Sequence, residues 1–182
     1  MNTAFRLLLT FNATSLLVIV FLVKKGCTLQ QLLPQYEVFI NIPNFLSYLS
    51  YLAVPVALTW LSIILSSWLG KDNFESGKVT AIEHANNSFL PSYLGYFFVA
   101  LSIPNVETLI FVYGILFVFT YLSQALYFNP LFLLFGFEFY NITTKNGAAI
   151  FLISHHSYKT PQEIDIASAF RINNYTYIEK DA

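Results

Sequence analysis

Apolar and polar positions divide the chain into long hydrophobic runs followed by a C-terminal part with a different period. The runs cover residues 7–23, 45–69, 89–103 and 108–127. A helix needs roughly 17–25 apolar residues to cross a bilayer, so three runs are long enough and the run at 89–103 is short. The pattern predicts four transmembrane helices, the last two forming a tight helical hairpin.

Proline and asparagine mark the expected ends and irregularities of these helices. Pro55 lies inside the second run and predicts a kink, because proline lacks a backbone N–H. Pro104 ends the third run, and Asn105 is a suitable N-terminal cap for the fourth. The first run ends in Lys24 and Lys25 rather than in small residues, which favours an uncleaved helix over a cleaved signal peptide.

After residue 130 the hydrophobic period changes from that of a helix to that of a strand. Phe135, Phe137 and Phe139 alternate with other residues, and the pair Asn146-Gly147 is typical of a tight hairpin turn. Residues 149–153 then form the expected return strand. The stretch between residues 70 and 88 carries many charges and is expected to be a polar loop.

The rest of the tail contains one helix signal and one further strand signal. Thr160 and Glu163 have the spacing of a capping box, with Pro161 at the first helical position. Residues 175–179 alternate again and predict a strand. The expected fold class is a mostly α membrane protein: residues 1–130 form a four-helix transmembrane domain, and residues 131–182 form a small α+β cytoplasmic tail.

Composition agrees with an exterior that faces lipid. Hydrophobic residues make up 56% of the 182 residues and charged residues only 10%. A soluble domain carries roughly 25% charged residues, and this chain could not cover a water-exposed surface with so few. The net charge of −1 provides no basic field, so direct binding of nucleic acid is not expected.

The distribution of lysine and arginine predicts the orientation. With four spans, the N-terminus, the polar loop and the tail share one side, and that side carries seven basic residues against Lys24 and Lys25 on the other. Basic residues accumulate on the cytoplasmic side. We therefore expect both termini in the cytoplasm.

The sequence offers little that resembles catalytic or metal chemistry. No ionisable residue lies at mid-depth in the expected spans, where such groups usually mark function. His155 and His156 are adjacent, so on a strand they point to opposite faces and are poorly placed to chelate one metal ion. No nucleophile or phosphate-binding motif is present. We expect no enzyme activity, cofactor, metal ion or small-molecule substrate.

Polar residues within the expected spans are small and uncharged. They are Asn12, Thr14, Ser15, Thr59 and Ser62. Hydrogen bonding between helices is the favoured interpretation, and a water-lined path is the alternative. The second interpretation leaves open a small oligomeric channel or pore-forming membrane effector.

Charged residues of the tail gather between its expected strands and form the candidate partner-binding surface. They are Lys159, Glu163, Asp165 and Arg171. Charged rims guide the choice of partner, whereas aromatic side chains supply much of the interface energy. Phe170 or Tyr175 is the expected aromatic anchor beside these charges.

Three tail segments carry a resemblance to a known family. They are Phe-Leu-Ile-Ser at 151–154, Pro-Gln-Glu-Ile at 161–164 and Phe-Arg-Ile-Asn-Asn-Tyr-Thr-Tyr-Ile at 170–178. With the four spans before them, these segments resemble the KwaA-like membrane subunit of the Kiwa anti-phage defence system. The resemblance implies a bacterial inner-membrane sensor and scaffold that works with a cytosolic, DNA-binding effector subunit. Because small sensor domains commonly act as closed homo-oligomers, a homo-oligomer is also expected.

Overall fold

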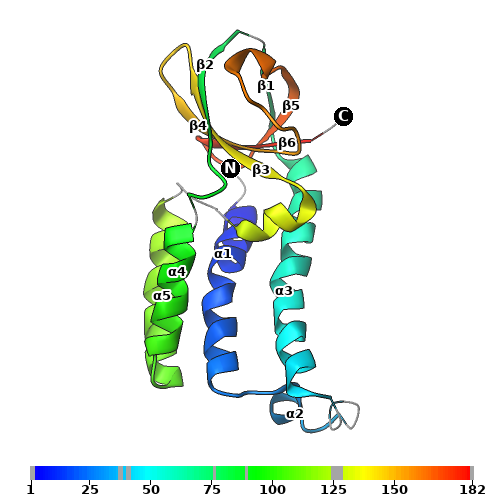
Figure 1. Cartoon of the computed structure of the whole chain (residues 1–182), viewed down its shortest axis with the longest axis vertical. Coiled ribbons are helices and arrows are strands. Elements are labelled where there is room, and N and C mark those ends of the chain that lie inside the picture. The colour runs from blue at the N-terminus through cyan, green and yellow to red at the C-terminus, as the bar shows by residue number, and fades with distance from the viewer. Residues whose placement is uncertain are drawn as a thin grey trace.

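The protein consists of a layer of helices with a curled β-sheet seated on one end of it (Figure 1). The computed structural model describes residues 3–36, 39, 42–75, 77–88, 90–123 and 129–180. The helices are α1 (Thr3–Lys24), α2 (Leu29–Leu32), α3 (Asn44–Leu65), α4 (Leu90–Ser102) and α5 (Val106–Ser123), and the short 3-10 turns are η2 (Ser66–Trp68), η3 (Pro130–Phe135) and η4 (Pro161–Glu163).

Each of the four apolar runs contains one of the longer helices. In the described part of the chain, three helical segments are long and apolar enough to cross a membrane: α1, α3 extended by η2, and α5. Helix α4 is shorter, as its run predicted. Asn105 caps α5, since its side-chain oxygen accepts a hydrogen bond from Thr108 N at 2.8 Å. The expected end of the fourth run, at 127, lies outside the described residues.

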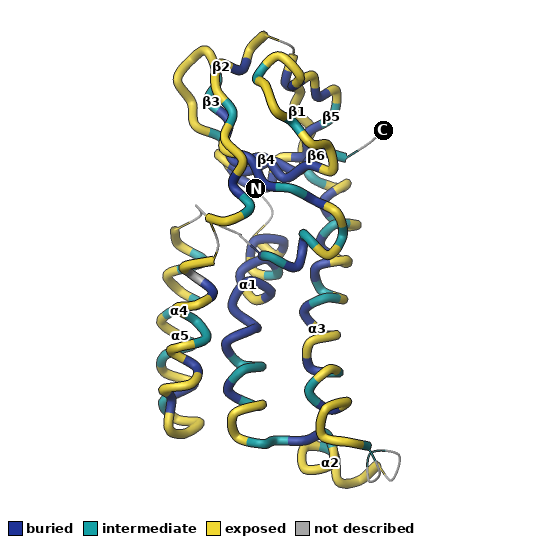
Figure 2. The backbone as a smooth tube through the Cα atoms, viewed as in Figure 1, coloured by how far each residue is buried: buried dark blue, intermediate teal, exposed yellow. Residues whose placement is uncertain are grey.

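Helix α1 is the centre of the helical layer. It packs against α3, α4 and α5, and it lies between α3 and the other two helices (Figure 1). Much of α1 is therefore buried, whereas the outer faces of α3, α4 and α5 are exposed (Figure 2). At the end far from the sheet, Lys24 Nζ donates to Ile103 O at 3.0 Å and Lys25 Nζ to Pro104 O at 2.7 Å. These lysines join α1 to the turn between α4 and α5, where a positive charge also stabilises the end of α4.

The sheet combines two distant parts of the chain. Its strands are β1 (Lys71–Phe74), β2 (Val79–His84), β3 (Glu138–Thr144), β4 (Ala149–Ser154), β5 (Ile166–Arg171) and β6 (Thr176–Glu179), in the order β1-β5-β6-β4-β3-β2. All neighbours are antiparallel except β4 and β6, which are parallel. The first two strands come from the segment between α3 and α4. The prediction that residues 70–88 form a loop is therefore wrong, because their strands pair with partners far along the chain.

The local signals of the tail are largely confirmed. Strands β3 and β4 form the predicted hairpin, with Gly147 at φ 77° in its turn. Strand β3 begins only at Glu138, because Phe135 belongs to η3 and Gly136 follows with φ 78°. The capping box at Thr160 is present, but it opens the single turn η4 rather than a longer helix. Strand β6 matches the predicted last strand, whereas β5 has no counterpart among the predictions.

The connection between β1 and β2 requires the sheet to curl. These strands are the two edges of the six-stranded sheet. Neighbouring strands are separated by about 4.8 Å, so a flat sheet would hold its two edges about 24 Å apart. The chain from Phe74 to Val79 reaches at most about 18 Å. The edges must therefore approach each other, and the sheet encloses its own small core.

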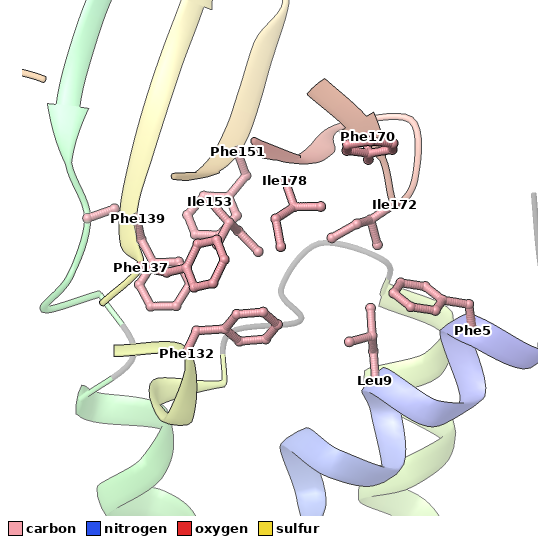
Figure 3. Packing of buried hydrophobic residues seen from close by; sticks show 11 residues of the cluster. Phe5, Leu9, Phe132, Phe137, Phe139, Phe151, Ile153, Phe170, Ile172 and Ile178 are labelled. Carbon is pink, nitrogen blue, oxygen red and sulfur yellow. The ribbon is translucent and has the colours of Figure 1, made fainter. Parts of the chain in front are cut away.

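The two faces of the sheet accordingly bury two separate apolar clusters. The inner core lies inside the curl and contains Phe74, Val79, Tyr140, Ile142, Leu152, Ile164, Ile166, Ala169 and Tyr177. The joint core lies between the sheet and the helices and contains Phe5, Leu9, Ala85, Phe132, Phe137, Phe139, Phe151, Ile153, Phe170, Ile172 and Ile178 (Figure 3). Because the joint core takes residues from α1, η3 and four strands, it fixes the sheet on the helical layer.

Candidate functional site

The loop between β4 and β5 brings three of the predicted partner-binding residues together. Lys159, Glu163 and Asp165 are all exposed there. The Glu163 carboxylate accepts hydrogen bonds from Lys159 N at 2.7 Å and from Thr160 N at 3.4 Å. The bond from the Lys159 backbone is the main reason why the pKa of Glu163 lies below its usual range. Glu163 therefore orders the loop, while Lys159 and Asp165 present opposite charges on it.

The other three predicted residues lie at the far end of β5. Arg171 is exposed, and its Nη2 donates to Asn174 Oδ1 at 2.9 Å. Tyr175 is 60% exposed, whereas Phe170 is only 6% exposed and belongs to the joint core. Strand β5 separates this group from the loop by about 17 Å, judged from its six residues. The structure thus leaves Tyr175, and not Phe170, available as an aromatic anchor.

A buried carboxylate lies beneath the β4–β5 loop. Glu179 on β6 is 6% exposed, and its carboxylate accepts hydrogen bonds from Tyr158 at 2.9 and 3.0 Å and from the Ser154 hydroxyl. His156 Nδ1 lies 3.3 Å from the same carboxylate. Burial and the nearby Glu179 raise the pKa of Tyr158, which keeps its hydroxyl a hydrogen-bond donor. The cluster anchors residues 154–158 to β6.

A second carboxylate continues this polar cluster towards β2. The Tyr140 hydroxyl donates to Glu138 and accepts from Tyr158 N at 3.1 Å, and His84 Nε2 lies 3.9 Å from Glu138. Burial is the main cause that raises the pKa of Tyr140. A cavity of about 350 Å³ opens here, lined by these residues with Ile82 and Lys159 among others. The charged loop and the polar cluster are therefore neighbours.

The residue types in this cluster include those of a nucleophilic triad, but their contacts differ from one. Ser154, His156 and Glu179 would need the serine hydroxyl to face the imidazole. Here the Ser154 hydroxyl is fully buried and donates to Glu179, while it accepts from the His156 backbone N at 2.8 Å. The observed hydrogen bonds fix the conformation of the loop and do not activate the hydroxyl.

The sequence contained one indication of this cluster, a glutamate at a core-facing position of the last strand. Glu179 shares a face of β6 with Tyr177, which belongs to the inner core. A carboxylate on a core-facing position must find hydrogen-bond donors, because an unpaired buried charge is very costly. The identity of the donors could not be predicted, since Ser154, His156 and Tyr158 come from a different segment.

The two adjacent histidines have different surroundings. His155 stacks against Phe137 with ring centres 3.6 Å apart, whereas His156 faces Glu179. The two histidines lie just after β4 and not on a strand, so their separation does not come from the strand alternation on which the prediction was based. No group of three or more metal-ligating side chains occurs among the residues that the structure describes.

Inside the helical layer, polar side chains hydrogen-bond to one another. Thr59 on α3 is the centre of this network: its Oγ1 lies 2.7 Å from the Asn12 amide of α1 and accepts from Asn129 Nδ2 at 2.9 Å. Asn129 Oδ1 in turn accepts from Leu131 N at 3.0 Å. The network confirms the interpretation of Asn12 and Thr59 as interhelical contacts, and it joins η3 to both helices.

Arg6 makes the corresponding contact at the sheet end of α1. Its Nη2 donates to Tyr121 O in the last turn of α5 at 2.8 Å, and its guanidinium lies 4.6 Å from the centre of the Tyr121 ring. A positive charge at a helix C-terminus is stabilising. Helix α1 is thus joined to α5 and α3 by polar contacts and to the sheet by apolar ones.

Comparison with known proteins gives one match. The family model described as anti-phage protein KwaA matches residues 5–178, which is nearly the whole chain. No curated protein and no solved structure matches this chain.

Proposed function

This chain belongs to the KwaA family of anti-phage proteins and has a role in anti-phage defence; within that role, we propose that it is the membrane sensor and scaffold of its system. The helices lie in the bacterial inner membrane, and both termini and the sheet face the cytoplasm. The sheet recruits and controls a cytosolic DNA-binding effector subunit. The protein performs no catalysis of its own.

The observation that carries this proposal is the joint core. Phe5 and Leu9 of α1 pack in one cluster with Phe132 of η3 and with Phe139 and Ile178 of the sheet. Packed cores respond to displacement by switching between arrangements rather than by deforming smoothly. A shift of α1 relative to α3 or α5 would therefore change how the sheet is seated, and with it the surface offered to a partner.

The stimulus that best fits these helices is a change in bilayer thickness or packing. The apolar helices differ in length, from the 13 residues of α4 to the 25 of α3 with η2. Helices of unequal length respond differently to bilayer thickness. A voltage sensor would carry arginines within its spans, whereas Arg6 lies in the first turns of α1 and contacts α5.

The exposed β4–β5 loop and Tyr175 are the proposed effector contacts. Lys159 and Asp165 supply charges, and the polar cluster beneath holds their loop in place. Exchange of these two charges, by Lys159→Asp combined with Asp165→Lys, leaves the net charge unchanged. We expect the double variant to insert and fold normally but to recover much less effector in a pull-down from detergent extract.

A matched control is available at the turn between β1 and β2. Lys78 and Glu75 are exposed and form an ion pair at 2.8 Å, so their exchange alters charges at another part of the sheet. Normal effector recovery by this control and reduced recovery by the first variant would locate the contact. Equal recovery by both variants and the wild type would show that the loop does not bind the effector.

Self-association is proposed through α5. Only 6% of the apolar helix Val106–Ser123 is buried within the chain. Gly114 on this helix has open space at the position where a Cβ would lie. Small residues let membrane helices approach closely. A second copy packed there would give the closed homo-oligomer that small membrane sensors commonly form.

A channel function would need polar side chains that face water. Thr14 donates to Thr10 O at 2.9 Å, Ser15 to Asn12 O at 2.7 Å, and Asn12 contacts Thr59. Their bonding groups are engaged within one chain, so no observation favours this alternative. Expression of the chain alone distinguishes the two: a channel dissipates the membrane potential, and a scaffold leaves it intact.

A further inference from the structure

We infer that the junction between α3 and β1 binds the headgroup of an anionic phospholipid. The binding groups are the ammonium groups of Lys71 and Lys180, beside Ser67 and Trp68. This inference rests on the proposed position of the helices in the bilayer, and it adds to that proposal a ligand and a site.

Two lysines from distant parts of the sequence lie beside the same aromatic ring at this junction. Lys71 Nζ lies 5.2 Å and Lys180 Nζ 5.9 Å from the centre of the Phe170 ring. Lys180 Nζ also donates to Ser67 Oγ at 2.9 Å. Strand β1 places Lys71 on one side of β5 and strand β6 leads directly to Lys180 on the other, so the fold brings both charges beside Phe170.

Within the described residues, no carboxylate forms an ion pair with these charges, since neither ammonium group has a carboxylate oxygen within 4.0 Å. Asp72 follows Lys71 on an alternating strand, and it contributes to the raised pKa of Tyr177, which belongs to the inner core on the other face. Two cations beside one ring, with no ion-pair partner in the described part of the chain, form a favourable place for an anion.

The position along α3 identifies the anion as a lipid headgroup. Asn44–Trp68 is a 25-residue apolar span, about 37 Å long as a helix, which exceeds the roughly 30 Å of a hydrocarbon core. Trp68 at its end is 84% exposed, and tryptophan favours the membrane–water interface. The lysines therefore lie at headgroup depth, on the side where anionic lipids concentrate in the inner membrane.

The surroundings suit both parts of such a lipid. A cavity of about 390 Å³ opens beside Trp68 and is also lined by Gly70, Arg171 and Asn174, so Arg171, rather than either lysine, is the cation that borders it. Below it, Trp60, Leu61 and Ile64 are exposed along α3 and offer an apolar surface to the acyl chains. The headgroup phosphate would meet the ammonium groups while the chains remain in the hydrocarbon.

The test compares lipid binding by the full-length chain and by the variant Lys71→Gln combined with Lys180→Gln. The purified protein in a neutral detergent is titrated with dioleoyl phosphatidylglycerol or dioleoyl phosphatidylcholine, and occupancy is measured by native mass spectrometry. Juxtamembrane lysines contribute about 1 kcal/mol each, so we expect the variant to bind phosphatidylglycerol about thirtyfold more weakly. Lys145→Gln, which removes a lysine beside the β3–β4 turn, should bind as the wild type does.

Equal affinity of the wild type for the two lipids, or unchanged affinity in the double variant, would overturn the inference. Complete displacement of the lipid by excess inorganic phosphate would also overturn it, because the ligand would then be a soluble anion. Membrane fractionation of the wild type and the double variant distinguishes failure of the lipid site from failure of the proposed membrane placement. A chain recovered without detergent would contradict the bilayer placement itself, whatever it binds.

Discussion

The helical layer and the curled sheet distribute their side chains in opposite ways. Helix α5 exposes its largest apolar residues, among them Ile110 at 67%, Phe111 at 69% and Phe119 at 64%. Strand β6 buries all four of its residues, including Glu179. Figure 2 shows the same contrast between the outer helices and the centre of the sheet.

This difference agrees with the proposed placement of the helices in lipid and of the sheet in water. A helix satisfies its backbone hydrogen bonds internally, so in lipid its apolar side chains can remain outside and its polar ones can pair inside. The sheet must instead hide its apolar side chains from water on both faces. The joint core is the place where the two arrangements meet, and variants in each region can test the contrast.

The largest effect is expected at the joint core. Phe132 is 1% exposed and contacts Phe137 and Phe139 edge to face, so Phe132→Ala leaves a cavity that should cost about 3–5 kcal/mol. Leu134 lies in the same turn but is 67% exposed, and Leu134→Ala should change stability by less than about 0.5 kcal/mol. Unfolding in detergent measures both. Similar losses in the two variants would contradict the packing of η3.

The next effect isolates the sheet. Gly147→Val forces a β-branched residue into a positive φ and should cost about 1–3 kcal/mol. Gly70→Val is the control, because Gly70 has an ordinary φ and open space around its Cβ position. Limited proteolysis should show faster cleavage of the sheet with intact helices in the first variant. If Gly147→Val resists proteolysis as well as the wild type does, the assignment of the β3–β4 turn is wrong.

A smaller effect is expected within the helical layer. Thr59→Val keeps the shape of the side chain but removes the oxygen shared by Asn12 and Asn129, and should cost about 1–2 kcal/mol. Ser102→Ala is the matched control, since this exposed hydroxyl bonds to Phe98 O of its own helix. Titration with a denaturing detergent compares the two. A larger loss of stability in Ser102→Ala than in Thr59→Val would mean that the polar network contributes little.

The smallest effect is expected on the exposed face of α5. Phe119→Ala should change the stability of a single chain by less than about 0.5 kcal/mol, because lipid or detergent surrounds this side chain. The measurement is unfolding in detergent, with the oligomeric state determined in parallel. A loss as large as that of Phe132→Ala would show that α5 is buried against protein, and an altered oligomer would identify the second copy as its neighbour.

Sequence alone predicted the helices and the β3–β4 hairpin, because both depend on local signals. Apolar runs of sufficient length leave few alternatives to a helix, and the turn at Gly147 requires a residue that accepts positive φ. Strands β1 and β2 were missed for a physical reason. They expose most of their residues at the sheet edges, so their alternation is weak, and pairing with β5 and β3 defines them.

The candidate site was predicted only in part. Lys159, Glu163 and Asp165 share a loop as expected, because nearness in sequence placed them together. Phe170 looked like a surface anchor beside Arg171, but a sequence does not reveal which face of an unrecognised strand meets the helices. The lysines over Phe170 could not be paired at all, since more than a hundred residues separate them.

The origin of the sheet from two segments has a consequence for biosynthesis. Strands β1 and β2 leave the ribosome before α4 and α5, and the partners that complete them emerge last. The unpaired edges must therefore wait while two more helices are synthesised, a period in which exposed strands are prone to aggregate. Lys71, Asp72 and Glu83 place charges on these strands, which disfavours pairing with other chains during that interval. Completion of the sheet therefore requires that both segments, and the helices between them, have been synthesised.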